Sequence, residues 1–392
     1  MAPAGATAGA PLPFRRFFLA AALYASVPVA VWLPASLGGR IGPIGATPLP
    51  LWHAQELLFG MMPAAMAGFL LTAVPRWTGR ALAAPRAVAL LLPLWLAGRI
   101  GAFAAPAAGA ALTVAFLLLL AAIVAGSIAA ARDQADAGPA VLVVLFALAG
   151  TIVRTDTADA AAVAFGLRLG LAAVLALHMI LAGRIIPALT AYYVRLQTGA
   201  ALRLRHRTIE RLSGGLAAAA LAAWVAAPAQ PPTLVLCLLA AVAHMVRLAG
   251  WQGWRVRRAA PVLALHVAYA WLPAGFLLLA WHIARPARLG ELAAVHAWAV
   301  GGIAVLCLGI MSSMIRRHTG QAFVGSPVAT ACYASGLLAA VARLLAELAP
   351  AWRGATLLAA ILLWIACYGL FLRGFGGALV PRRWPRSGAA IR

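Results

Sequence analysis

The chain has 392 residues, of which 65% are hydrophobic and 10% are charged, and its mean hydropathy is +0.96. Soluble domains are about half apolar and about one quarter charged, so this composition excludes that class and indicates an integral membrane protein. The formal net charge of +23 does not indicate nucleic-acid binding, because the arginines lie in short clusters between apolar runs rather than along one soluble face. We therefore expect an all-α polytopic membrane protein.

The apolar residues fall into runs that predict membrane-spanning helices. A spanning helix needs roughly 20 mostly apolar residues, and proline and glycine residues mark the joints between successive runs. We predict about twelve transmembrane helices in one integral membrane domain over residues 1–392, with a cytoplasmic N-terminus at 1–13 and a cytoplasmic tail at about 375–392. The runs begin near Phe14, Leu51, Ala87, Ala107, Pro139, Ala161, Thr208, Thr233, Pro261, Leu292, Pro327 and Ala355.

The distribution of arginines predicts the orientation of these helices. Short cytoplasmic loops of membrane proteins are enriched in Arg and Lys. A cytoplasmic N-terminus assigns 21 arginines to cytoplasmic segments and six to segments on the opposite side. The asymmetry also favours an even number of spans, so both termini are predicted to be cytoplasmic.

Polar residues at the outer ends of two runs are candidate metal ligands. His53 and Glu56 are three positions apart at the start of the second run, so they share a helix face. His296 lies near the predicted outer end of the tenth run. Imidazole is a common ligand for iron and copper, so we predict an outer-level site formed by His53, Glu56 and His296. The alternative for the first two is a polar headgroup position beside Trp52, which is typical of membrane interfaces.

The cysteines give no sign of a metal or disulfide motif. Cys237, Cys307, Cys332 and Cys367 are widely spaced and lie in apolar segments, where a cysteine usually acts as a small hydrophobic residue. Cys307 and Met314 share a helix stripe with His296, and this set of donor types suits copper(I). The stripe spans about 27 Å, which is too long for one ion. Packing is therefore the expected role of Cys307 and Met314.

Histidines also lie in the predicted inner half of the membrane, where an ionisable side chain is a functional candidate by default. Two of them, on different helices, are expected to be the axial ligands of a b-type haem. We rank His266 first and leave its partner open. His206 and His282 are instead expected in solvated or headgroup positions. The inner candidates are His178, His244, His266 and His318.

Two arginines in the same half are candidate anion partners. Arg184 and Arg247 are predicted to pair with the haem propionates or with another anion, although arginines near a membrane interface also extend their side chains to water. Pro187 follows Arg184 in an overlong apolar run and is expected to interrupt the helix. The deep segments contain almost no acidic residues, which weighs against a proton pump or a cation-coupled transporter. No nucleotide-binding loop or nucleophile motif is present.

Seven stretches, in the expected order, resemble the NnrS family of bacterial inner-membrane proteins and cover residues 14 to about 320. This resemblance implies about twelve spans, bound haem and copper, and a role in the response to nitric oxide and nitrosative stress. It also places His53, Glu56, Arg184, Pro187, His266, His296 and His318 at family motif positions. The stretches are PFRRFFL, WHAQELLFG, GFLLTAVPRWTGR, GRIIPALTAYY, HMVRLAGWQGWR, LHVAYAWLPAG and AVHAWAVGGIAVLCLGIMSSMIRRHTG.

The chain departs from the family pattern at two places. The first family motif usually reads His-x-His-Glu, whereas this chain has Gln55 at the second histidine. Glutamine is a poor substitute for an imidazole ligand of copper, so this position is either not an essential ligand or the outer site is altered. Ser312-Ser313-Met314 also stands where the family commonly has Thr-Arg.

Three hypotheses of function follow from these observations. The first is a haem and copper protein in the membrane that acts in nitric oxide tolerance by binding, sensing or electron transfer. The second is a transporter for a metal ion or a small anion that uses the histidines as a passage. The third is a structural or assembly protein. The expected partners are membrane lipid, haem, copper and nitric oxide, and a haem absorption band distinguishes the first hypothesis from the other two.

Overall fold

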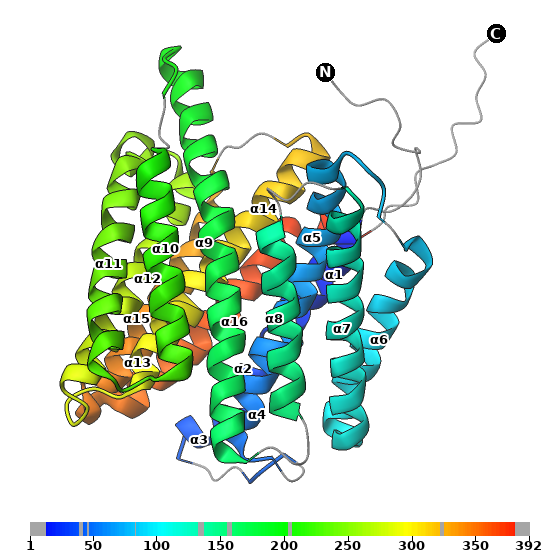
Figure 1. Ribbon diagram of the computed structural model, residues 1–392, viewed down its shortest axis with the longest axis vertical. Coiled ribbons are helices and arrows are strands. Elements are labelled where there is room, and N and C mark those ends of the chain that lie inside the picture. Colours follow the sequence, from blue (N-terminus) through cyan, green and yellow to red (C-terminus); the bar gives the residue numbers. More distant parts are fainter. Residues whose placement is uncertain are drawn as a thin grey trace.

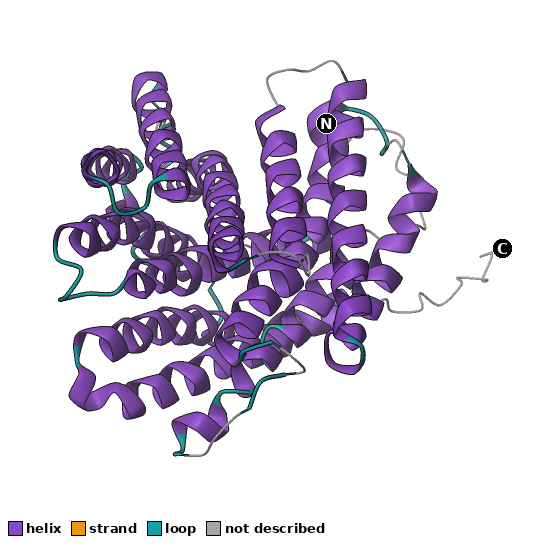
Figure 2. Cartoon of the chain, turned by 60° about the horizontal axis from the view of Figure 1, so that its bottom comes forward, coloured by secondary structure: helices purple, strands orange, loops and turns teal. Residues whose placement is uncertain are grey.

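The computed structural model describes residues 13–38, 42–44, 47–82, 84–131, 137–154, 159–202, 206–321 and 325–380. Its described residues form helices and connecting loops, as Figure 2 shows. The only extended pairing among them is an isolated bridge between Ile44 and Thr47. The all-α fold expected from the composition is confirmed.

Eleven helices in the described part of the chain are long and apolar enough to cross a membrane. They match the second to twelfth predicted runs, with starts that differ by a few residues. Many leucines, isoleucines and valines on their surfaces are exposed, as expected for side chains that face lipid. The eleven are Leu49–Thr78 (α4, η1 and α5), Pro85–Ala104 (α6), Pro106–Ala130 (α7), Ala137–Arg154 (α8), Ala160–Thr198 (α9), Arg207–Ala226 (α10), Pro231–Gly250 (α11), Ala260–Ala284 (α12), Glu291–Thr319 (α13, η4 and α14), Pro327–Leu348 (α15) and Pro350–Leu379 (η5 and α16).

The first predicted run is helical but broken into three pieces: α1 (Pro13–Tyr24), α2 (Val27–Ala30) and α3 (Leu33–Ser36). A proline inside a helix removes a hydrogen-bond donor and clashes with the preceding turn, and α2 and α3 each contain one. The breaks leave backbone carbonyls for other helices. The Trp364 indole donates to the Ala25 carbonyl over 2.8 Å, and the Pro28 carbonyl lies 3.0 Å from the His53 imidazole.

Helix α9 is continuous over 39 residues, so the interruption predicted at Pro187 is wrong. Its length of about 58 Å far exceeds the roughly 30 Å of a bilayer core, and one end of α9 extends past the neighbouring helices (Figure 1). The helix begins where the Asp159 side chain accepts from the Ala162 amide over 2.7 Å. It ends at Gly199, whose positive φ of 69° provides a left-handed C-cap.

Two spans differ from the others because each joins two α-helices through a π-helix. In the first, α4 (Leu49–Gln55) and α5 (Met62–Thr78) flank η1 (Glu56–Met61). In the second, α13 (Glu291–His296) and α14 (Val305–Thr319) flank η4 (Ala297–Ala304). Some 83% of each apolar stretch is buried, against 28–61% for the other nine. These two composite helices are therefore the centre of the bundle, and in each a predicted histidine ligand, His53 or His296, lies in the short α-helix that precedes the π-helix.

The C-terminal helix α16 (Arg353–Leu379) includes Phe375 and Leu379, which are buried against the bundle. The tail boundary at about 375 stays a prediction. Residues 1–12 and 381–392, which include most of the two predicted cytoplasmic termini, lie outside the described residues.

Candidate functional site

Glu56 lies at the centre of a buried charge cluster. Its carboxylate forms ion pairs with Arg99 of α6 and with Arg154 of α8, the latter over 2.8 Å. The Tyr24 hydroxyl donates to the same carboxylate over 2.6 Å, and Arg99 also donates to the Thr113 hydroxyl. We call Glu56, Tyr24, Arg99 and Arg154 the Glu56 cluster. Counted over these described residues it carries one negative and two positive charges, which is unusual because buried charges are normally paired.

A glycine in the π-helix allows Arg99 to reach Glu56. The Arg99 guanidinium lies directly against Gly60, where any side chain would collide with it. Trp95, one helical turn before Arg99 on α6, donates from its indole to the Gly60 carbonyl over 2.8 Å. Irregular backbone in a membrane requires such partners, and π-helices are frequent at functional sites. The π-helix η1 and helix α6 thus pack directly against each other at Gly60.

The His53 imidazole points away from this cluster. Its Nδ1 donates to the Pro28 carbonyl over 3.0 Å, because a carbonyl can only accept. The ring also packs edge-on against Trp32, with centroids 5.8 Å apart. Nε2 therefore carries the lone pair. Gln55, at the position of the second family histidine, instead donates to the Val153 carbonyl of α8 over 3.4 Å.

His296 has a similar arrangement on the other composite helix. Its Nδ1 donates to the Leu292 carbonyl over 2.8 Å, so its Nε2 also carries a lone pair. His53, His296 and Arg343 lie within electrostatic range of one another. Arg343 in turn donates to the Glu347 carboxylate, one turn further along α15, over 2.7 Å. The structure thus brings the two outer histidines to one region.

The predicted three-residue site is not present in that form. No group of three or more His, Cys, Asp or Glu side chains in the described part of the chain is arranged to hold a metal ion. The carboxylate of Glu56 is occupied by Tyr24 and two arginines, whereas His53 turns toward Pro28. The spacing of three residues places Glu56 and His53 on the same side of α4 and η1. It does not determine which neighbouring residues each side chain contacts.

A second buried cluster lies among α9, α10, α11 and α12. Arg247 forms an ion pair with Glu210 and donates to the Tyr269 hydroxyl over 2.8 Å and to the Met179 carbonyl over 3.2 Å. The Tyr269 hydroxyl also lies 2.5 Å from Nδ1 of His244. We call Arg247, Glu210, Tyr269 and His244 the Arg247 cluster. The guanidinium of Arg247 is thus paired with a carboxylate of this chain, and this geometry does not favour the predicted role with haem propionates.

His266 is connected to the second cluster through Trp251, whose ring contacts both His266 and Tyr269, but it takes no part in the hydrogen bonds of that cluster. Its Nε2 lies 2.9 Å from the Thr190 hydroxyl. The Thr190 hydroxyl donates its one hydrogen bond to the Ile186 carbonyl. It therefore accepts a hydrogen bond from Nε2–H of His266. Nδ1 therefore carries the lone pair, is buried against Gly253 and has no hydrogen-bond partner among the described residues. An unpaired buried acceptor of this kind calls for a ligand or another explanation.

The remaining inner candidates are dispersed. His178 is buried, and its Nδ1 donates to the Val174 carbonyl over 2.9 Å. His318 packs on Phe14, with ring centroids 5.0 Å apart. Arg184 lies over the Trp77 ring, with its guanidinium carbon 5.7 Å from the centroid. Of the four inner histidines, only His244 and His266 share neighbours, since the rings of Trp251 and Tyr269 contact each other and these imidazoles.

A pocket lies next to α12, the helix that carries His266, at the predicted cytoplasmic side of the protein. It encloses about 590 Å³ and is lined by two tyrosines of α9 and by three arginines. Val262, in its wall, is one helical turn before His266 on the same face of α12. The tyrosines are Tyr192 and Tyr193, and the arginines are Arg258, Arg316 and Arg317.

Sequence reasoning missed the partners of Glu56, whereas it named Arg247 as an anion partner without naming Glu210. Arg99 and Arg154 are 43 and 98 positions from Glu56, and no local pattern joins residues at such separations. A signal was present for Arg99, because an arginine inside an apolar run requires a partner. Tyr24 and Tyr269 gave no signal, since an aromatic residue in an apolar run usually belongs to the core.

These features define an α-helical membrane protein whose bundle encloses ion-paired arginines and buried histidines. The family model described as NnrS protein matches residues 10–383, nearly the whole chain, and the chain belongs to this family. No curated protein matches the chain.

Proposed function

We propose that this protein is a haem-containing membrane protein that acts in the bacterial response to nitric oxide and nitrosative stress, with copper as a second cofactor. Membership of the NnrS family over residues 10–383 supports this proposal. The observation that carries it in the molecule is the buried, unpaired Nδ1 of His266, which occupies a family motif position. The other candidate ligands are His178, His244 and His318, and the partner of His266 stays open.

His266 meets one requirement of a metal-ligating histidine. Thr190 fixes one ring nitrogen, and the other carries a lone pair without a hydrogen-bond partner among the described residues. The adjacent pocket has the volume of a cofactor site, and its arginines suit propionate carboxylates. A bound b-type haem would supply a redox-active iron that binds diatomic ligands. The chain would hold the haem through His266 and would pair the arginines of the pocket with its propionates.

The absorption spectrum of the purified protein tests this proposal. We expect a Soret band in the detergent-purified protein and a shift of that band when nitric oxide is added to the reduced sample. His266→Ala should abolish or shift the band while the protein still inserts, because the apolar spans are unchanged. His282→Ala is the matched control, since the His282 ring bonds only to the Leu289 carbonyl near a loop. An unchanged spectrum in His266→Ala would assign that residue to a structural hydrogen bond.

A transporter for a metal ion or a small anion is the second candidate. The Glu56 cluster favours an anion over a cation, because two guanidiniums surround one carboxylate. Absence of haem from the purified protein, together with anion uptake into proteoliposomes that is lost in Arg99→Gln, would support this alternative. Haem binding without uptake would exclude it.

We further propose that the protein lies in the bacterial inner membrane with both termini in the cytoplasm. The arginine distribution supports this orientation. Helix α10 offers a direct test because Arg207 and Pro231 flank its two ends. Reporter fusions should place Arg207 in the cytoplasm and Pro231 outside it, and the reverse result would contradict the orientation.

A further inference from the structure

A small cavity between α1, α5, α9 and α14 is lined by several sulfur-containing residues. Its volume is about 20 Å³, enough for one water molecule or one ion. Three of the eight methionines of the chain, one of its four cysteines and one histidine line it, and the other walls are leucine, isoleucine, alanine and phenylalanine side chains. A water molecule needs two to four polar partners, which these walls do not supply. The donors are Met62, Met66, Cys307, Met311 and His178.

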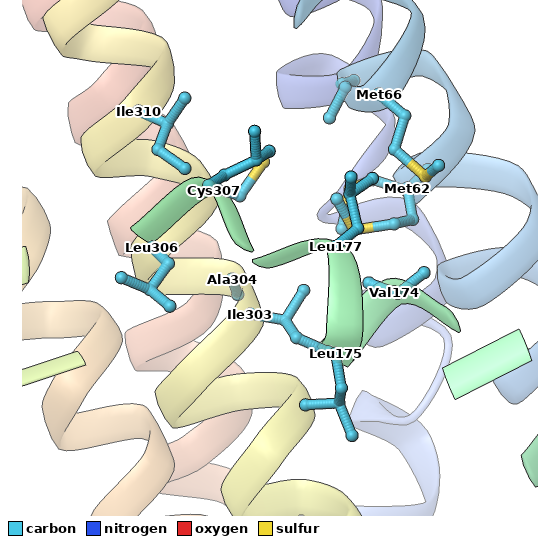
Figure 3. Close-up of a cluster of buried hydrophobic side chains, with 14 of the residues drawn as sticks. Met62, Met66, Val174, Leu175, Leu177, Ile303, Ala304, Leu306, Cys307 and Ile310 are labelled. Carbon is cyan, nitrogen blue, oxygen red and sulfur yellow. The ribbon is translucent and has the colours of Figure 1, made fainter. Parts of the chain in front are cut away.

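The sulfur donors form two pairs on facing helices. Met62 and Met66 are one helical turn apart on α5, and Cys307 and Met311 are one turn apart on α14. The Cys307 Sγ lies 3.6 Å from the Met311 Sδ. Figure 3 shows Cys307 extending from α14 toward α5, which carries Met62 and Met66. All four side chains are buried, so their sulfur atoms do not face lipid or water.

His178 contributes a nitrogen donor of defined protonation. Its Nδ1 donates to the Val174 carbonyl over 2.9 Å, which places the proton on that nitrogen. Nε2 therefore carries a lone pair, and no hydrogen bond to it occurs among the described residues. Fixing one ring nitrogen through a carbonyl while the other coordinates is the common arrangement of histidine ligands to metals.

We propose that these five residues form a binding site for copper(I). Thioether, thiolate and imidazole donors match a soft monovalent ion, whereas magnesium and calcium prefer oxygen ligands. Binding replaces the thiol proton of Cys307: the S–H bond breaks, an S–Cu bond forms and the proton leaves to solvent. One positive charge replaces another, so the total charge of the cavity does not change. A divalent ion would leave an excess charge in apolar surroundings, where no carboxylate lines the cavity.

This site lies apart from the His53 and His296 pair. It rests on the proposed function, in which copper is the second cofactor, and it names the residues that would bind that copper. The sequence stripe of His296, Cys307 and Met314 was rejected as a copper site because of its length. The structure instead joins Cys307 to Met311 of the same helix and to donors from two other helices.

Copper(I) titration of the full-length protein tests the site. The detergent-purified protein is titrated anaerobically with copper(I) in competition with bicinchoninate, and bound copper is measured by mass spectrometry. We expect one equivalent of copper per chain and a sulfur-dominated first shell by X-ray absorption. Cys307→Ala and the double variant Met62→Leu, Met66→Leu should each weaken binding by at least about tenfold, because removal of even an outer partner costs that much.

Matched variants separate loss of the site from loss of the fold. Cys237→Ala removes a buried thiol of α11, and Met179→Leu changes a buried methionine next to His178; neither lines the cavity. Both should bind copper as the unchanged protein does. Methionine to leucine exchanges nearly conserve volume, so the double variant should stay folded. The Soret band of each sample reports the haem separately.

Three results would overturn the proposal. The first is equal copper affinity in the cavity variants and the controls, and the second is a first shell of nitrogen and oxygen atoms alone. The third is absence of copper binding by the unchanged protein. Loss of copper only in His53→Ala or His296→Ala would place the ion at the outer histidines instead.

Discussion

The Glu56 and Arg247 clusters are built from the same parts but distribute charge differently. Each contains a carboxylate, a tyrosine and an arginine whose guanidinium packs on a glycine, Gly60 in one and Gly183 in the other. In each the guanidinium carbon lies 5.8 Å from the centroid of the tyrosine ring, Tyr24 in one and Tyr269 in the other. The glycines permit contacts that any side chain would block.

The difference lies in what accompanies that shared unit. In the Glu56 cluster a second arginine, Arg154, forms an ion pair with Glu56, and the Tyr24 hydroxyl donates a hydrogen bond to the carboxylate. In the Arg247 cluster, His244 stands instead of a second arginine, and the Tyr269 hydroxyl accepts a hydrogen bond from Arg247. The second cation makes the stability of the Glu56 cluster depend on its single carboxylate. The neutral imidazole makes the stability of the Arg247 cluster depend more on the hydroxyl of Tyr269.

Glu56→Gln should give the largest effect on stability. It leaves Arg99 and Arg154 buried together without their shared counter-charge, and loss of one partner from a buried ion pair costs about 3–5 kcal/mol. Unfolding of the purified protein in mixed micelles by sodium dodecyl sulfate measures this loss. A loss below that of Glu210→Gln would show that the second arginine does not make the first cluster more dependent on its carboxylate.

Glu210→Gln should have a smaller effect, about 1.5–3 kcal/mol, the range for hydrogen bonds to charged groups. Arg247 keeps its contacts to the Tyr269 hydroxyl and the Met179 carbonyl, and the Glu210 side chain is 14% exposed, so solvent moderates the loss. The same unfolding experiment measures it. Equal losses for Glu210→Gln and Glu56→Gln would remove the distinction between the clusters.

Tyr269→Phe should cost about 1–2 kcal/mol, because it leaves Nδ1 of His244 buried without a partner. Tyr24→Phe is the matched variant at the other cluster and should cost less, since Glu56 keeps two arginines. Thermal unfolding of both variants in the same detergent gives the comparison. The opposite order would mean that the phenol matters more where two cations are present.

Glu347→Gln should give the smallest effect, about 0.2–0.5 kcal/mol, the value for an ion pair one turn apart on a helix. Arg343 is 15% exposed and Glu347 is 12% exposed, and both belong to α15, so the loss affects an ion pair within one helix rather than between helices. Thermal unfolding should show almost no shift. A loss as large as that of Glu210→Gln would indicate that Arg343 is as dependent on its carboxylate as Arg247.

The spans could be predicted from the sequence because length and apolar content are local properties. Runs bounded by Pro85, Pro231 or Pro327 begin within a few residues of their predicted starts. Pro187 shows the limit of local rules, since packing of α9 keeps the helix continuous where an isolated proline would interrupt it. The breaks in the first span also follow from prolines. Only the packing of the surrounding bundle therefore determines whether a proline interrupts a helix or leaves it continuous.

The candidate sites were only partly predictable. Residue type pointed to His178, His244 and His266 as candidates, because an ionisable group in an apolar run needs a reason to be there, and all three are buried; their role as ligands stays a prediction. Contacts were not predictable, since Arg154 and Glu56 meet only through the packing of α8 against the π-helix. The sulfur cavity was missed for the same reason: Met62 and Met311 belong to helices far apart in the chain and each alone resembles a core residue.

The π-helices η1 and η4 have a consequence for insertions and deletions. A π-turn spans five residues between hydrogen-bonded groups, one more than an α-turn. A short π-helical segment absorbs one extra residue in an α-helix, so deleting one residue within Glu56–Met61 would restore regular α-helix and leave Met62 and Met66 on nearly the same face relative to His53. The same deletion in a regular α-helical part of the span would rotate the following face by about 100°. These two segments are therefore the places in their spans where one residue can be lost while the helices on either side keep their faces.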